Sequence, residues 1–368
     1  MKITNIYHWQ PAQWLAYVLL FAGMLYIPQL VDNPFTLNQL SRYAVYALLA
    51  VSVSFVWGFA GILSLGQGIA FGMAAYGMAM TMQMQAQDPE FDPVPSFMLT
   101  NGLEELPWLW EPFWNTDLGL FLALAVPTLF FAGFGAMMFQ ARVAGVFVAI
   151  MTLAMLSAIY SMAYDMQPYT AGFNGISPPM PFQWGDTMVD PYSADAYLIC
   201  VSVLAGLTLL LKALLSSKFG LLMRAIRDDA ERARFLGYNV ALYQIVVFAI
   251  SGFVAAAAGI CWVMMVQYVS PTALEITFSI SMVIWAAVGG RTSLFGAILG
   301  AVLVNGTASY LGDELQQVWM MILGGIFIVI VLLLPRGLAE LFEIVLGRLT
   351  RLVRGESAPG AARVGEVR

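Results

Sequence analysis

Charged residues are scarce in this 368-residue sequence. Only 10% of the residues are charged, 60% are hydrophobic, and the mean hydropathy is +0.79. An average soluble domain carries about 25% charged residues, and a chain of this length does not need so much apolar surface to form a core. The composition therefore excludes an ordinary soluble domain and indicates a membrane protein.

Cysteine and histidine are nearly absent as well. Cys200 and Cys261 lie in separate apolar runs, so we expect two buried thiols and neither a disulfide nor a metal pair. The single histidine, His8, lies in a polar and aromatic N-terminal segment that suits the membrane interface. We therefore expect no metal site and no cofactor.

Long apolar runs dominate what is present. Within lipid every backbone polar group must be paired inside the protein, and runs of about 20 residues suit helices rather than barrel strands. We predict an all-α polytopic membrane protein with about ten transmembrane helices, at residues 12–30, 43–60, 68–84, 118–139, 145–164, 195–215, 241–268, 276–290, 294–311 and 317–335. The runs near 68–84 and 276–311 are short and interrupted by Gly, which is typical of broken or re-entrant helices.

Basic residues fall almost entirely on one side of these spans. With the N-terminus inside, every Lys and Arg except Arg42 lies in a cytoplasmic segment, and carboxylates gather on the other side. The positive-inside rule therefore predicts that both termini are cytoplasmic. We expect a transmembrane domain at 1–340, with external segments at 85–117 and 165–194, a cytoplasmic loop at 216–240 and a basic cytoplasmic tail at 341–368.

Tryptophans mark the first external segment. Trp108, Trp110 and Trp114 alternate there with acids and prolines. Aromatic residues in this pattern suit a short helix at the membrane interface. The segment is either such an anchor or a docking surface for an external partner.

Ionisable residues are almost absent from the expected spans, where ion-coupled carriers usually hold their relay groups. Glycine and small polar residues form two patches there instead, at 58–80 and 289–306. Both contain G-x-x-S-L followed by Gly, at Gly61 and at Gly290, which suggests an internal repeat. Close helix packing through small residues and broken helices that line a polar path are both compatible with these patches.

The densest charge cluster lies in the stretch SSKFGLLMRAIRDDAERARFLGYNVALYQ at 216–244. Arginines alternate with carboxylates, and Gly237 is placed to end a short helix at Leu236. Two apolar patches separate the charges, one formed by Leu222, Ala225 and Ile226, the other by Ala233, Leu236 and Tyr238. A solvated loop needs no such patches, so we predict that this loop inserts into a groove on another protein.

Three motifs carry a resemblance to a known family. They are R-A-I-R-D-D-x-x-R-A-x-x-L-G-Y-N at 224–239, G-I-L-S-L-G-Q-G-x-x-F-G-x-x-A-Y at 61–76, and V-I-W-A-A-V-G-G-R-x-S-L-x-G-A-x-L-G-A at 283–301, with a final L-P-R-G-L. Together they resemble the permease subunits of the branched-chain amino acid and urea family of ABC importers. The segment P-S-F-M-L-T-N-G-L-E-E-L-P-W-L-W-E-P-F at 95–113 resembles the insertion of the urea-type subunit. Phe173 departs from the Gly or Asn that such permeases often have.

The resemblance implies a transport subunit rather than an enzyme. It implies import of urea, or alternatively of branched-chain amino acids, across a bacterial inner membrane. The implied partners are a second homologous permease subunit, two cytoplasmic ATP-binding subunits, an external solute-binding protein and membrane lipid, with no nucleic acid. The chain has no G-x-x-x-x-G-K-[ST] loop, so ATP hydrolysis is expected on a partner.

The resemblance also assigns site residues. It implies ATPase coupling through Arg224, Ala225, Ile226, Arg227, Asp228, Asp229, Arg232, Ala233, Leu236 and Gly237. For the translocation path we expect polar groups without counter-charge, at Ser64, Gln67 and Asn174. An ion-coupled secondary carrier and a passive urea channel remain open as other classes, although neither needs a docking helix in its charged loop.

Overall fold

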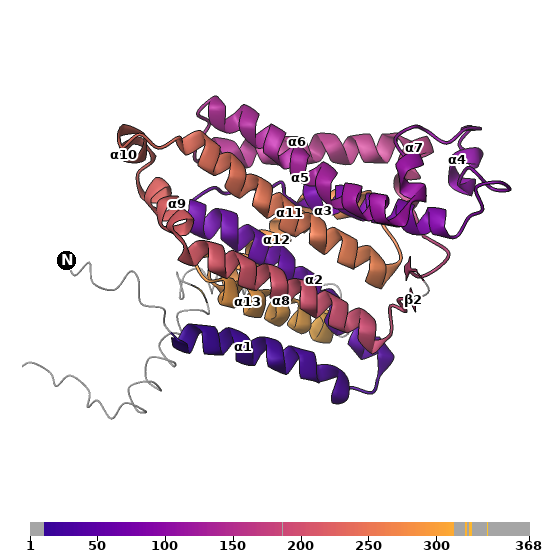
Figure 1. Cartoon of the computed structure of the whole chain (residues 1–368), viewed down its shortest axis with the longest axis horizontal. Coiled ribbons are helices and arrows are strands. Elements are labelled where there is room, and N and C mark those ends of the chain that lie inside the picture. The colour runs from indigo at the N-terminus through magenta and orange to yellow at the C-terminus, as the bar shows by residue number, and fades with distance from the viewer. Residues whose placement is uncertain (1–10, 186, 313–320, 322–323, 326–336, 338–368) are drawn as a thin grey trace, which may run out of the picture.

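The structure, a computed structural model, describes residues 11–185, 187–312, 321, 324–325 and 337. Long helices run side by side along the longest axis of the molecule, and short irregular segments gather at both ends (Figure 1). Among the described residues the strands are limited to the short antiparallel pair β1 (Gln183–Trp184) and β2 (Thr187–Met188). The predicted all-α membrane class is confirmed.

In the described part of the chain five helices are long and apolar enough to cross a membrane, or up to six if the bent pair α12–α13 counts as one span. The long helices are α1 (Pro11–Tyr26), α2 (Pro34–Val53) with the π-helical turn η2 (Ser54–Phe59), α3 (Gln67–Gln85), α5 (Thr116–Gln140), α6 (Val146–Asp165), α8 (Ala194–Ser216), α11 (Val240–Val266), α12 (Ile276–Gly289) and α13 (Leu294–Gly312).

Nine of the ten predicted spans coincide with these helices, but they do not all qualify as separate spans. Helix α1 is apolar but short. Helices α12 and α13 were counted as two spans and also expected to be broken or re-entrant; they bend by 117° at the turn between them, so they form at most one broken span or a re-entrant pair. Only residues 321 and 324–325 of the predicted span at 317–335 are described, and the tail at 341–368, His8 and both termini lie outside the described residues.

Helix α3 lies at the centre of the bundle. It packs against α5 and α11, and all of its residues except Met73 and Gln85 are buried. Because protein rather than lipid surrounds it, its apolar content does not have to match that of a lipid-facing helix. The run of small residues at 255–259 in α11 allows the two backbones to approach closely.

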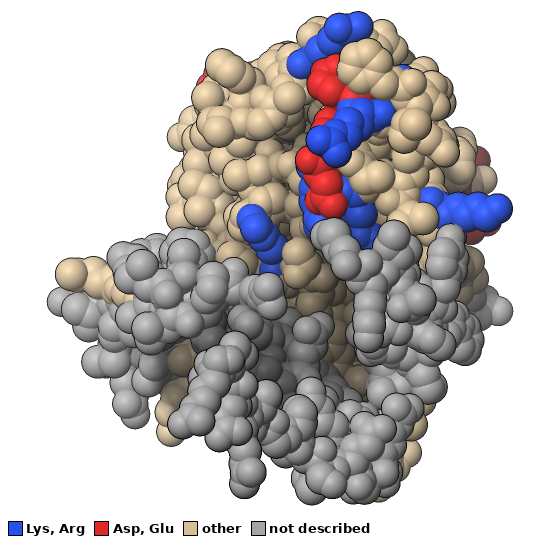
Figure 2. Space-filling view, turned by 90° about the vertical axis from the view of Figure 1, so that its left-hand side faces the viewer, with Lys and Arg blue, Asp and Glu red and all other residues tan. Residues whose placement is uncertain are grey.

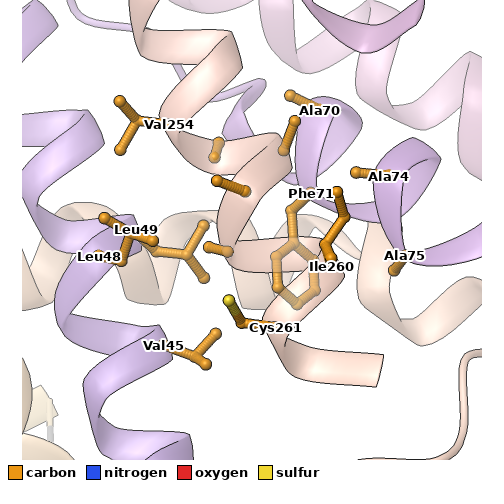
Figure 3. Packing of buried hydrophobic residues seen from close by; sticks show 14 of the residues in the cluster. Val45, Leu48, Leu49, Ala70, Phe71, Ala74, Ala75, Val254, Ile260 and Cys261 are labelled. Carbon is orange, nitrogen blue, oxygen red and sulfur yellow. The ribbon is translucent and has the colours of Figure 1, made fainter. Parts of the chain in front are cut away.

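Side chains from three helices interlock in this core. Figure 3 shows Val45 and Leu49 of α2 facing Val254 and Cys261 of α11, with Phe71 of α3 beside them. Bulky side chains fill the spaces that the small residues leave, as close packing requires. The thiol of Cys261 lies within hydrogen-bonding range of Cys200 on α8, and both are free and buried. Two thiols from separate apolar runs thus meet inside the bundle.

The two ends of the bundle differ in character. One end carries α4 (Ser96–Thr100), η3 (Glu111–Trp114), α7 (Gln167–Thr170) and η4 (Gly172–Asn174), and the other carries α9 (Lys218–Asp228) and α10 (Ala230–Phe235) (Figure 1). The segments predicted to be external therefore lie opposite the loop predicted to be cytoplasmic. Trp110 is buried and donates a hydrogen bond to the Tyr169 carbonyl at 3.2 Å, which ties the two external segments together, whereas Trp108 is exposed.

Candidate functional site

The charged loop folds as two short helices rather than as the single short helix that was expected. The hydroxyl of Ser217 accepts a hydrogen bond from the Phe219 amide and caps α9. The chain is extended at Asp229, whose carboxylate accepts from the Arg232 amide at 3.0 Å and caps α10. Helix α10 ends at Phe235 and is followed by Gly237 at φ +88°, so the predicted helix end is confirmed to within one residue. We call α9 and α10 together the hairpin.

A small apolar cluster holds the hairpin together. Ile226 of α9, Ala233 of α10 and Val240 at the start of α11 are buried against one another, with Leu222, Ala230 and Tyr243 beside them. Ile226 and Ala233 were expected on patches that contact a partner. The structure places both inside the hairpin, because two short charged helices need an apolar contact of their own to pack.

The exposed surface of the hairpin is formed by other residues. Phe235 and Leu236 are 88% and 77% exposed at its tip. Figure 2 shows Lys and Arg alternating with Asp and Glu in a stripe over this end of the molecule. Arg232 pairs there with Asp229 at 2.8 Å, and Arg234 pairs with Glu231. Phe235 was not predicted as a site residue, although an aromatic residue directly after a run of charges was visible in the sequence.

Two arginines of α9 bond to backbone carbonyls instead of facing outward. Arg224 donates to the carbonyls of Gly220 at 3.1 Å and Leu215 at 3.3 Å, where α8 meets α9. Arg227 reaches away from the loop and donates from Nη1 to the Gly58 carbonyl at 2.8 Å. Its Nε and Nη2 donate to the carboxylate of Asp228 at 3.0 and 2.9 Å. Arg227 therefore links the hairpin directly to the membrane bundle.

Gly58, whose carbonyl Arg227 binds, lies where the two glycine-rich patches at 58–80 and 289–306 come into close contact. A methyl group at Gly58 would overlap the Arg291 carbonyl oxygen, so only glycine allows this approach. The Ser54 hydroxyl donates to the same carbonyl at 2.9 Å, and the Arg291 guanidinium lies 5.5 Å from the centre of the Trp57 ring. We call Gly58, Gly61, Arg227 and Arg291 the glycine junction.

The two repeated motifs adopt related turns. Gly61 and Gly290, at their starts, both have positive φ, at +73° and +112°. The hydroxyl of Ser64 accepts from the Gly66 amide at 3.2 Å, and that of Ser293 accepts from the Gly296 amide at 3.1 Å. Each motif thus forms a turn and starts a helix, α3 in one case and α13 in the other.

The expected path residues divide into two places. Gln67 is buried and donates to the Ser251 hydroxyl at 3.2 Å, while the Ser52 hydroxyl lies 3.3 Å from its amide oxygen. Ser64 is buried in the same segment, where it caps its own turn. Asn174 is exposed at the opposite end, and its carbonyl accepts from the Tyr268 hydroxyl. The structure therefore does not bring the three together.

Polar contacts from other helices, which were not predicted, hold the irregular segment 61–66. The Thr152 hydroxyl of α6 accepts from the Leu65 amide at 3.1 Å, and the Ser279 hydroxyl of α12 donates to the Leu65 carbonyl at 2.6 Å. These bonds satisfy backbone groups that a regular helix would pair internally. Nothing in the sequence distinguishes Thr152 or Ser279 from other hydroxyl residues in apolar runs.

The buried polar residues of the described part of the chain are uncharged Ser, Thr, Asn and Gln. None of the described His, Cys, Asp or Glu residues forms a group of three that could hold a metal ion. The fully buried polar residues that are described therefore offer hydrogen-bonding groups without charge, whereas the half-buried Arg42 of α2 has a buried Nε without a hydrogen-bond partner among the described residues.

Comparison with known proteins places the chain in a family. The profile described as "Branched-chain amino acid transport system / permease component" matches residues 35–332. The high-affinity branched-chain amino acid transport system permease proteins LivM of Escherichia coli (strain K12) and Salmonella typhimurium are 25% and 26% identical to it over 85% of this chain and 72% of their own length. The fructose import permease protein FrcC of Rhizobium meliloti is 32% identical over 30% of this chain and 33% of its own.

No solved structure matches the chain. The family match extends over eight of the nine long helices, from α2 to α13, and over both glycine-rich motifs and the hairpin. The chain therefore belongs to the family of permease components of branched-chain amino acid transport systems.

Proposed function

We propose that this chain is the membrane subunit of an ATP-driven importer and that its hairpin docks on a cytoplasmic ATP-binding subunit. The observation that carries the proposal is the hairpin tip, where Phe235 and Leu236 are 88% and 77% exposed between charged side chains. Large apolar residues at the tip of a charged loop are costly in water, and aromatic residues that fill a pocket often dominate binding energies. A groove on a partner would cover them.

The remaining parts of the assembly follow from this role. The chain has no phosphate-binding loop of its own, so hydrolysis belongs to two ATP-binding subunits. A second homologous permease subunit and an external solute-binding protein complete the importer. In this arrangement the complex lies in the bacterial inner membrane, the hairpin faces the cytoplasm, and the segments at 85–117 and 165–194 face the binding protein.

Urea is the cargo that we propose. It is small and uncharged, so its path needs hydroxyl and amide groups and no counter-charge, in agreement with the uncharged buried polar residues of the described chain. A branched-chain amino acid is the second candidate, because the LivM relatives are named for that cargo. An ion-coupled carrier or a passive channel would leave the exposed tip of the hairpin without a role.

Uptake by cells that lack the chain tests the cargo. Cells complemented with the chain should accumulate radiolabelled urea above its external concentration, and ATP depletion should abolish accumulation. Accumulation of leucine but not urea would show that the cargo is a branched-chain amino acid and would leave the proposal of an ATP-driven importer unchanged. Uptake that persists without ATP and stops at equilibrium would indicate a channel, and uptake abolished by an ionophore at constant ATP would indicate a secondary carrier.

Copurification tests the docking surface. In Phe235→Asp the tagged chain should lose its ATP-binding subunit, because a carboxylate replaces an apolar anchor, with a loss of about tenfold or more in bound subunit. Phe91→Asp is the matched control, since Phe91 is 82% exposed at the opposite end of the bundle. Equal retention of the ATP-binding subunit by both variants would contradict docking through the tip.

A further inference from the structure

We infer that Arg227 is the positioning residue through which movement of the hairpin reaches the bent pair α12–α13. The inference rests on the proposed function, because it needs a partner that moves the hairpin. It concerns a different property from docking: how the hairpin is connected to the membrane helices once the partner is bound.

The first link is the fork of the Arg227 guanidinium. Its Nη1 binds the Gly58 carbonyl, while its Nε and Nη2 bind Asp228 on the same helix. A guanidinium is planar, so the bonds to Asp228 fix the direction in which Nη1 points. The aliphatic part of the Arg227 side chain is also tightly packed against Gly61, since a methyl group at Gly61 would lie 2.6 Å from Arg227 Cγ.

The second link joins Gly58 to the turn between α12 and α13. The two backbones touch at Gly58 and Arg291, and the Ser54 hydroxyl holds the Arg291 carbonyl at 2.9 Å. Closely packed backbone has little free volume to absorb a displacement. A shift of Gly58 must therefore move the turn at 290–293 or break these contacts.

The third link reaches the other end of α12. Gly61, under the Arg227 stem, begins the irregular segment that leads to Leu65, and the Leu65 carbonyl accepts the Ser279 hydroxyl at 2.6 Å. Ser279 lies near the start of α12, and Arg291 lies directly after its end. Arg227 thus contacts both segments that hold α12, and the 117° bend between α12 and α13 lies at one of them. Discontinuous helices of this kind form the substrate sites of many transporters, at the interface of repeats that rock against each other.

The burial of the arginines separates transmission from docking. The Arg227 side chain is 31% exposed and is bonded inward, whereas Arg232 is 86% exposed on the outer surface of the hairpin. A substitution of Arg227 should therefore leave the partner bound to the hairpin but prevent the partner's movement from reaching α12 and α13. A residue that only docks would lose the partner and transport together.

The experiment uses the complex that copurifies with the tagged chain. Arg227→Met keeps the length of the stem and removes the three hydrogen bonds, while Arg227→Lys keeps a donor that can reach Gly58. Each variant is measured for membrane level, for bound ATP-binding subunit, for basal ATP hydrolysis, and for uptake of radiolabelled urea and leucine. Arg142→Met is the matched control, because Arg142 is exposed in another loop predicted to be cytoplasmic.

Arg227→Met should keep the ATP-binding subunit and basal hydrolysis within about twofold of wild type and lose about tenfold or more of uptake. Arg227→Lys should recover at least about half of the uptake, because an ammonium also donates to a carbonyl. Arg142→Met should behave as wild type.

Three results would overturn the inference. They are undiminished uptake by Arg227→Met, loss of the ATP-binding subunit from Arg227→Met, and equal loss of uptake in the Met and Lys variants. A wild-type chain that binds no ATP-binding subunit would instead overturn the proposed function, so the two failures are distinguishable.

Discussion

Gln67 illustrates how the structure changes the reading of single residues. Its amide was expected to line the path, yet it bonds to Ser251 of α11 and lies beside Ser52 of α2. Gln67→Met removes both contacts, while the Ser251 hydroxyl keeps its bond to the Phe248 carbonyl and the Ser52 hydroxyl keeps its bond to the Ser251 carbonyl, so the chain should be destabilised by about 0.5–1.5 kcal/mol. Thermal unfolding in detergent measures this, and the cargo preference among properly folded molecules should not change.

Tyr76→Phe is the control for Gln67→Met. The Tyr76 hydroxyl is buried without a hydrogen-bond partner, so its removal should leave the unfolding temperature unchanged or slightly raised. A Gln67→Met variant with wild-type stability and altered cargo selectivity would contradict the structural role and show that Gln67 lines the translocation path.

Residue roles in the hairpin could be predicted from the sequence only in part. The composition of the loop predicts a partner surface and its limits, but not which apolar residues face inward. Ala233 and Phe235 lie on the same helix and differ in the face of α10 that they occupy, and the face that packs against Ile226 of α9 depends on the break at Asp229. From the sequence, the Asp229 carboxylate could cap α10 or pair with an arginine. The structure shows that it does both, because one oxygen accepts from the Arg232 amide and the other pairs with the Arg232 guanidinium.

At the scale of elements, the hairpin is a unit that one buried contact holds together. Ala233→Glu should place a carboxylate in the cluster of Ile226 and Val240, where Ala233 is only 4% exposed. Burying an unpaired charge is strongly destabilising, so trypsin should cleave the hairpin arginines faster than in wild type. Limited proteolysis of inverted membrane vesicles measures the rate.

Ala225→Glu is the matched change on α9, because Ala225 is exposed. It should keep the trypsin resistance of the hairpin while it alters the outer surface. Equal cleavage of Ala225→Glu and Ala233→Glu would show that the cluster does not hold the hairpin.

The bend between α12 and α13 is a feature that hydrophobic runs in the sequence cannot predict. Length and apolarity predict two spans at 276–290 and 294–311, and both helices are present there. At the 117° bend Gly290 has a positive φ, α12 and α13 approach each other closely at Gly289 and Gly300, and Arg291 contacts Gly58, which lies far away in the sequence. The Gly-rich composition predicts that a break occurs, but it does not predict the angle at which the two helices pack.

At the scale of the whole molecule, apolar runs predict the protein class and the helix positions, whereas charge asymmetry predicts the orientation in the membrane. The runs predict the class of the protein and the positions of its long helices, and the structure confirms both. The number of spans depends on short or bent helices such as α1 and α12, whose path through lipid is determined by neighbouring helices. The distribution of charge predicts orientation separately, because it compares loops at opposite ends of the bundle.

Orientation can be measured at the two ends directly. Phe91 and Phe235 are 82% and 88% exposed at opposite ends, and the native thiols of Cys200 and Cys261 are buried. A membrane-impermeant maleimide should therefore label Phe91→Cys in spheroplasts, and Phe235→Cys only in inverted vesicles from cells that lack the ATP-binding subunit, which would otherwise cover the tip. The wild-type chain, labelled in neither preparation, provides the background. Labelling of Phe235→Cys in spheroplasts would place the hairpin outside, where no ATP-binding subunit could reach it, and would overturn the orientation and the coupling through Arg227 together.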